Sequence, residues 1–181
     1  MRQLQTISWQ LDDSDCPYLA KLTQWQSLVF KMKFEIPIEP KPQSRPRASV
    51  RGRHATVYED RKMSAWRKKC TELVRQLYDG PYFDGAIKVD MTFYMPAPKS
   101  ISEPPKPKSK QKKKDEYDRF IAEKIPCDKK IDLDNLEKSA YDSISKSEIV
   151  WQDDCLVVEH TTRKVYSMNP RIEVNIQYYD N

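Results

Sequence analysis

Two groups of acidic residues have the types and spacing of a metal-binding site. They are the segment Asp132-Leu133-Asp134-Asn135-Leu136-Glu137-Lys138 and the pair Asp153-Asp154. Carboxylates at i and i+2 of an extended segment point the same way, so Asp132 and Asp134 could hold one hard cation, with Asp153 or Asp154 as a third ligand. Because Mg²⁺ keeps its other positions for water and phosphate, the pattern indicates phosphodiester hydrolysis.

Each of these residues also has a purely structural interpretation. Asp134 is a good helix N-cap, and Glu137 three residues later would complete a capping box without any metal. Lys138 could be a point charge near a phosphate, or it could form a surface ion pair with Asp134 or Asp142. The Asp153-Asp154 pair could be a turn before a strand. These alternatives stay open at the level of the residues.

Basic residues gather in one part of the chain. The total of 32 Lys and Arg against 27 Asp and Glu gives a net charge of +5. Between residues 41 and 75 the only acids are Glu59, Asp60 and Glu72, whereas the bases are Lys41, Arg45, Arg47, Arg51, Arg53, Arg61, Lys62, Arg67, Lys68, Lys69 and Arg75. This segment is either a surface that faces nucleic-acid phosphates or an ordinary solvated face.

Apolar periodicity predicts one domain of strands and helices. Alternation at every second residue predicts strands, and recurrence at every third or fourth residue predicts helices. In chain order we expect a strand over 33–39, a helix over 59–78, a strand over 86–95, a helix over 135–146, and strands over 155–166 and 172–178. We therefore predict an α/β (α+β) fold in which two main helices pack on one side of a small mixed sheet. The element order is β-α-β-α-β-β, and the last two strands form a hairpin.

Three segments fall outside these elements. We expect residues 1–30 to be an N-terminal extension with a short helix near 17–29, so that the main domain covers 31–181. Residues 40–58 should form a long surface loop. Residues 96–125, rich in lysine and proline at their start, should be a mobile insertion, either a nucleic-acid contact that orders on binding or a solvated insertion with no role.

The acidic segments carry a resemblance to a known family. The pattern D-x-D-N-x-x-K over Asp132 to Lys138, followed by Trp151 and Asp153-Asp154, closely resembles the RusA family of Holliday-junction resolvases. The resemblance is tight over roughly residues 129–176 and looser over 33–95. It implies a Mg²⁺-dependent endodeoxyribonuclease that works as a homodimer and cuts four-way DNA junctions symmetrically, in recombination and repair.

The resemblance also implies roles for individual residues. Asp132, Asp134 and Asp154 become catalytic metal ligands, Asp153 a further acid at the metal, and Lys138 a catalytic cation near the phosphate. Asn135 would orient Asp134. Mn²⁺ suits the same oxygen ligands as Mg²⁺. The expected DNA-binding residues are Lys41, Arg45, Arg47, Arg51, Arg53, Lys129 and Lys130.

Other classes of protein are excluded by what the sequence lacks. Its three glycines cannot build a glycine-rich nucleotide cradle, so no nucleotide cofactor is expected. There is no apolar run of about 18 residues for a membrane span and no apolar stretch at the start for a secretory signal, so we expect a cytoplasmic protein. The alternative function is a non-catalytic DNA-binding protein that uses the basic loops and keeps its acids as caps and ion pairs.

Overall fold

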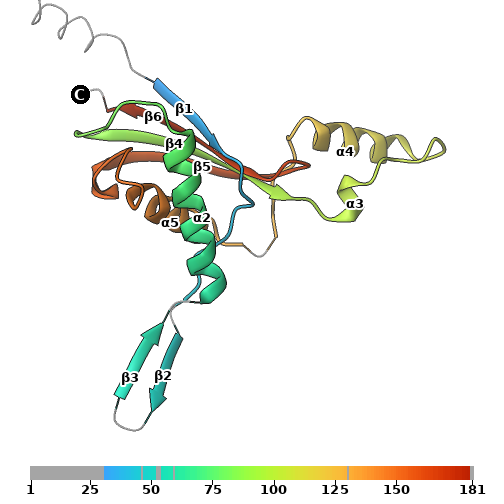
Figure 1. Ribbon diagram of the computed structural model, residues 1–181. Helices are drawn as coiled ribbons and strands as arrows, with labels where there is room; N and C mark the ends of the chain where they lie inside the picture. The colour runs from blue at the N-terminus through green and yellow to red at the C-terminus, as the bar shows by residue number, and fades with distance from the viewer. Residues whose placement is uncertain (1–30, 46, 52–53, 59, 130, 180–181) are drawn as a thin grey trace, which may run out of the picture. The chain divides into compact units, whose positions relative to one another are not determined.

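Four strands that alternate or concentrate apolar side chains form one mixed sheet. The computed structural model describes residues 31–179 except 46, 52–53, 59 and 130, and of residues 46–59 it describes only the backbone. The strands are β1 (Lys31–Ile36), β4 (Ile87–Pro96), β5 (Val157–Ser167) and β6 (Arg171–Tyr178), in the order β1-β6-β4-β5 (Figure 1). β6 runs antiparallel to β1 and β4, whereas β5 runs parallel to β4.

Two helices cover one face of this sheet, as predicted. α2 (Arg61–Leu77) begins at Asp60, whose carboxylate accepts hydrogen bonds from the backbone N–H groups of Lys62 and Met63. α5 (Leu133–Ser145) buries Leu136, Ala140 and Ile144, which recur at helical spacing. α2 contacts β1, α5 contacts β5, and the helices contact each other, so both lie on the same side of the sheet.

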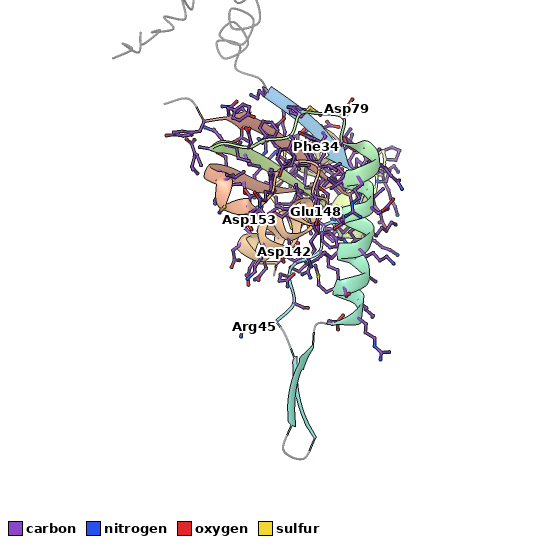
Figure 2. The ribbon with its side chains drawn as sticks, turned by 60° about the vertical axis from the view of Figure 1, so that its left-hand side comes forward. Phe34, Arg45, Asp79, Asp142, Glu148 and Asp153 are labelled. Carbon is purple, nitrogen blue, oxygen red and sulfur yellow. The ribbon has the colours of Figure 1, made fainter. Side chains whose placement is uncertain are left out.

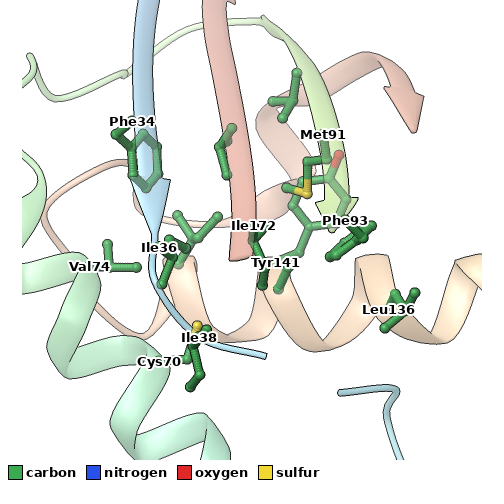
Figure 3. Close-up of a cluster of buried hydrophobic side chains, with 14 of the residues drawn as sticks. Phe34, Ile36, Ile38, Cys70, Val74, Met91, Phe93, Leu136, Tyr141 and Ile172 are labelled. Atoms are coloured by element: carbon green, nitrogen blue, oxygen red, sulfur yellow. The ribbon is translucent and has the colours of Figure 1, made fainter. Parts of the chain in front are cut away.

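The core lies between these helices and the sheet. Alternate side chains of the central strands are fully buried and meet the apolar stripes of both helices. Figure 3 shows part of this cluster, with Phe34 and Ile36 of β1 near Val74 of α2, and Phe93 of β4 on the side of α5. Because the core reaches both helices, α2 and the whole of α5 are held firmly against the sheet.

The strand pairing differs from the prediction. β5 and β6 follow one another through the predicted turn at 167–170, but they do not form a hairpin, since β4 lies between them. β6 instead pairs with β1, with Val174 opposite Phe34, and on its other side with β4. The prediction was wrong because pairing between strands distant in sequence leaves no local periodic signal.

Two segments that we expected to be loops contain secondary structure. Within 40–58 the backbone forms a hairpin of β2 (Arg47–Arg51) and β3 (His54–Tyr58), a two-stranded sheet of its own. Within 96–125, which we expected to be a mobile insertion, the chain forms the helices α3 (Lys99–Ser102) and α4 (Gln111–Ile121), whereas its mobility stays a prediction. A short 3₁₀ turn, η1 (Asp154–Leu156), precedes β5.

Residues 31–181 form one compact unit. The helix expected near 17–29 lies outside the described residues, and the division of the chain at residue 31 stays a prediction. Among the helices of the described part, none is both long and apolar enough to cross a membrane.

Candidate functional site

The first acidic segment forms the start of α5. Asp132 is the N-cap residue, with extended backbone angles (φ −69°, ψ 133°), but its side chain makes no capping hydrogen bond. Asp134 lies in the first turn of the helix, and both side chains are exposed. The capping box considered as an alternative for Asp134 and Glu137 is therefore not formed, and the expectation that Asp132 and Asp134 share one extended segment was wrong. Both carboxylates at this helix end face solvent, and Asp134 in the first turn interacts favourably with the helix dipole.

Lys138 follows Asp134 by about one helical turn and is exposed. Within the part of the chain that the structure describes, Lys138 makes no ion pair. Asp142, the other acid that could have paired with it, lies 3.4 Å from Arg67 Nη2 of α2 instead. The surface ion pair considered for Lys138 is thus not formed, and its ammonium group is available to another anion.

Asn135 is half-buried at the same helix end, where it helps to hold a neighbouring loop. Its backbone carbonyl accepts a hydrogen bond from the N–H of Gln43 at 2.8 Å. Ser139 Oγ, one turn later, donates to the carbonyl of Lys41 at 2.7 Å. Arg67 Nη2 of α2 donates to Gln43 Oε1 at 2.6 Å. The root of the basic segment is therefore fixed beside the acidic start of α5.

The second acidic pair lies at η1, and its two carboxylates differ. Asp153 accepts a hydrogen bond from the N–H of Cys155 at 2.9 Å, which lowers the pKa of Asp153. The pKa of Asp154 is raised, first by desolvation and then by the negative charges of Asp153 and of Asp142 on α5. Figure 2 marks Asp142 and Asp153. Asp153 thus has a structural partner, whereas Asp154 is an acid that a cation would relieve of repulsion.

The two acidic groups do not form one ready-made ligand cluster. The pKa of Tyr141, raised mainly by burial, is raised further by the charges of Glu137 and Asp154. Asp132 and Asp134 lie about two turns before Tyr141 on the helix. Among the described residues, no three His, Cys, Asp or Glu side chains lie close enough together to hold a metal ion.

One side of β5 supports the start of α5, and our sequence reasoning missed these residues. Thr162 Oγ1 donates a hydrogen bond to Glu137 Oε1, and His160 Nε2 lies 3.7 Å from the same oxygen. Lys164 Nζ donates to the carbonyls of Lys129 and Ile131, just before Asp132. The alternate positions 160, 162 and 164 put these side chains on one face of β5, which was a signal in the sequence.

The predicted DNA-binding residues are only partly described. Arg45 and Lys129 are exposed and Lys41 is half-buried. The backbone of Arg47 and Arg51 lies in β2, which places both on the hairpin. Arg53 and Lys130 lie outside the described residues. Their contact with DNA stays a prediction.

A groove with a cavity volume of about 820 Å³ opens next to this site. Three stretches of chain line it: residues 39–42, the end of β4 with residues 97–98, and the segment before α5. Trp66 and Tyr166 add aromatic walls, while Lys41 and Lys129 add positive charge. The groove therefore joins apolar surfaces with cations immediately before Asp132.

Comparison with known proteins adds two findings. The sequence matches the family described as endodeoxyribonuclease RusA over residues 37–177, which is most of the chain. It is also 29% identical over 146 residues to a protein of Bacillus subtilis (strain 168) described as uncharacterized protein YqaN, covering 81% of this chain and 95% of that protein. The family match includes every acid of the site and most of the described fold.

Proposed function

Because the chain belongs to the RusA endodeoxyribonuclease family, we propose that it is a metal-dependent endonuclease that resolves four-way DNA junctions by paired symmetric nicks, in recombination and repair. The observation that carries the proposal is the start of α5. There Asp132 and Asp134 are exposed and have no ion-pair partner within the described chain, and Lys138 is equally unpaired one turn later. The helix dipole favours the two acids at this helix end but does not account for the unpaired Lys138, whereas a metal and a phosphate would account for all three charges.

The donor set fits a hard cation. RusA family nucleases are generally metal-dependent, and Mg²⁺ is typically bound through one or two carboxylates together with water and substrate phosphate. We assign Asp132 and Asp134 as ligands, and Asp154 as a third ligand that has to move toward them on metal binding, because the three carboxylates do not lie together among the described residues. Mn²⁺ should be an effective substitute. When bound, the metal would polarise the scissile phosphate and activate water.

The chain's own groups have separate roles in this proposal. Lys138 places positive charge next to the phosphate as negative charge develops on it. Glu137 is held by Thr162 and fixes the orientation of α5, while Asn135 ties the basic loop to the same helix end through its carbonyl. Asp153 keeps η1 in shape, so that Asp154 faces α5.

We also propose that the protein acts as a homodimer. A four-way junction has two-fold symmetry, so cutting two opposed strands symmetrically requires two sites related by the same symmetry. Sedimentation of the protein with and without junction DNA tests this directly. Monomer alone under both conditions would contradict it.

The experiment that tests the function is a denaturing-gel cleavage assay. A synthetic four-way junction and a matched linear duplex are incubated with and without Mg²⁺, using wild-type protein, Asp134→Asn and the control Asp79→Asn, which changes an exposed acid elsewhere. We expect paired nicks on the junction alone, retained by Asp79→Asn and lost by Asp134→Asn, with unchanged circular dichroism. Junction binding without nicks in either metal would instead show a non-catalytic DNA-binding protein.

A further inference from the structure

A run of lysines on the segment before and into α4 is unexplained by the site. Between residues 106 and 114 the chain has six lysines and no acid, and we call this segment the lysine arm. Five of the lysines are exposed and Lys114 is half-buried. None of the six makes an ion pair within the described residues. The lysine arm is therefore a concentrated positive charge that forms no ion pair with the described part of the chain.

The lysines do not stabilise the helix that carries them. Lys112, Lys113 and Lys114 occupy its first turns, where positive charge opposes the helix dipole, and no acid lies in the first turn to offset them. The acids of α4 come later, and Asp115 accepts a hydrogen bond from Gln111. What packs α4 against the core is Phe120, which is almost fully buried. A partner of opposite charge would explain the run, whereas the fold does not.

The far end of α4 is tied firmly to the sheet. After Ala122, Glu123 takes a left-handed conformation (φ 55°) that ends the helix. Its two carboxylate oxygens accept hydrogen bonds from Arg171 of β6 at 2.7 and 2.9 Å, and Ser167 Oγ donates to it at 2.6 Å. The Arg171 guanidinium also lies 3.5 Å from the ring centre of Tyr94 in β4. The root of the lysine arm is therefore fixed in position rather than free to swing.

The same attachment continues to the acidic site. The carbonyl of Ile125 accepts from Tyr166 N–H at 2.9 Å, and Cys127 N–H donates to the Lys164 carbonyl at 3.0 Å. Lys164 in turn holds the carbonyl of Ile131, the residue before Asp132. A continuous set of hydrogen bonds along β5 thus connects the root of the lysine arm with the start of α5. A ligand bound to the lysine arm would therefore lie at a defined distance from Asp132 and Asp134.

We propose that the lysine arm is a second DNA-binding surface, which holds the phosphates of a duplex arm of the junction while α5 engages the strand to be cut. The inference rests on the proposed function and deepens it. Double-stranded DNA fits because several lysines along one segment match a row of phosphates, and each contact releases counterions. The groove bordered by Lys41 and Lys129 lies between the start of the insertion and Asp132, so it provides a surface between the two contacts.

The test measures junction affinity against salt concentration in EDTA, where cleavage cannot interfere. The two-lysine variant is Lys112→Gln/Lys113→Gln. The two-lysine control is Lys31→Gln/Lys146→Gln, which removes two exposed lysines elsewhere. The four-lysine variant adds Lys108→Gln and Lys110→Gln to the two-lysine variant. Each lost phosphate contact should reduce the slope of log affinity against log salt by about 0.9. We expect a loss of about tenfold or more for the four-lysine variant on junctions with long arms, and a smaller loss when the arms are short.

Two outcomes would overturn the inference. One is an unchanged junction affinity and an unchanged slope of log affinity against log salt for the four-lysine variant. The other is a loss of junction affinity in the control Lys31→Gln/Lys146→Gln that equals the loss in Lys112→Gln/Lys113→Gln. Failure of the proposed function is distinguishable, because nicking by the wild-type protein in Mg²⁺ is measured on the same junctions. If the wild type nicks and the lysine variants bind and nick equally well, the lysine arm has no DNA role although the protein is a resolvase.

Discussion

Acidic side chains on the two faces of the sheet differ in whether they form ion pairs. On the face away from the helices, Arg171 pairs with Glu123, Glu173 and Glu35, and its side chain is only 12% exposed. On the helix-covered face, the start of α5 presents Asp132 and Asp134 to solvent without an ion pair in the described chain. Carboxylates on one face are paired with an arginine, whereas those at the start of α5 form no ion pair with a described residue.

The difference separates structural acids from functional ones. A carboxylate that accepts hydrogen bonds from a partly buried arginine contributes to the free energy of folding. An exposed carboxylate without such a partner contributes little beyond its interaction with the helix dipole. Exposed acids that contribute so little to stability are suited to bind a metal instead. Substitutions should therefore affect activity at α5 and stability at Arg171.

The largest effect is expected from Asp134→Asn. Cleavage of junction DNA should fall about 100-fold or more, since the loss of a group that only orients a metal ligand already costs roughly 10- to 100-fold. The midpoint of thermal unfolding should fall only slightly, because the exposed Asp134 side chain contributes little beyond its interaction with the helix dipole. A parallel loss of stability would show that Asp134 is a structural acid after all.

Lys138→Gln should come next, with cleavage reduced by about 100-fold at saturating Mg²⁺, as for the loss of one group that stabilises developing charge. Metal affinity should not fall, because lysine is no ligand. Lys146→Gln, just past the end of the same helix, is the matched control and should cut normally. Single-turnover cleavage rates measure both. Equal rates for Lys138→Gln and Lys146→Gln would remove Lys138 from the mechanism.

On the other face, Glu123→Gln should cost about 1–2 kcal/mol of unfolding free energy, since it removes a charged partner of Arg171. Glu103→Gln changes an exposed acid of the same insertion and should have no effect. Urea unfolding at neutral pH measures both variants. The cleavage rate on junctions should stay within a few-fold of the wild type. A loss of cleavage without a loss of stability in Glu123→Gln would show that Glu123 serves the reaction and not the fold.

The pH dependence of the unfolding free energy follows from the direction in which the pKa of Glu123 is shifted. Hydrogen bonds from Arg171 hold the pKa of Glu123 below its usual value in the folded protein. Its contribution is therefore fully present above the usual glutamate pKa and is lost as the pH falls through the lowered value. The difference in unfolding free energy between wild type and Glu123→Gln should shrink over that acidic range. A constant difference down to the acid limit would contradict the pairing.

The smallest effect should distinguish Asp153 from Asp154. Asp153→Ala removes the hydrogen bond to the N–H of Cys155 and should lower stability slightly, whereas Asp153→Asn keeps the acceptor and should be nearly neutral. Asp153→Asn should also cleave better than Asp154→Asn. Equal loss of cleavage in Asp153→Asn and Asp154→Asn would instead indicate that both aspartates are metal ligands.

Local periodicity predicted the elements of this fold but not their pairing. α2 and β4 follow the expected ranges closely because their apolar residues recur at regular spacing over many residues. The helix α4 was missed because its apolar stripe is short, with only Tyr117, Phe120 and Ile121 at helical spacing in an otherwise charged segment. The β2–β3 hairpin was missed because arginines and prolines outweigh its short alternation. The position of β4 between β5 and β6 depends on contacts between distant parts of the chain.

For the site, the sequence predicted which residues matter better than how they are arranged. The pattern from Asp132 to Lys138 indicated the acids and the family, but the helix starts at Asp132 rather than at Asp134. The supporting residues Thr162 and Lys164 were missed, because their roles depend on β5 lying beside α5. The metal and the assignment of its ligands remain predictions.

The central claim, that the unpaired acids of α5 hold a divalent ion, is tested most directly by metal binding without DNA. Mn²⁺ binding followed by electron paramagnetic resonance is measured for wild type, Asp132→Asn/Asp134→Asn and Glu123→Gln. We predict that wild type and Glu123→Gln bind Mn²⁺ alike, that Mg²⁺ displaces it, and that the double variant loses this binding while it remains folded. Unchanged Mn²⁺ binding by the folded double variant would contradict the claim.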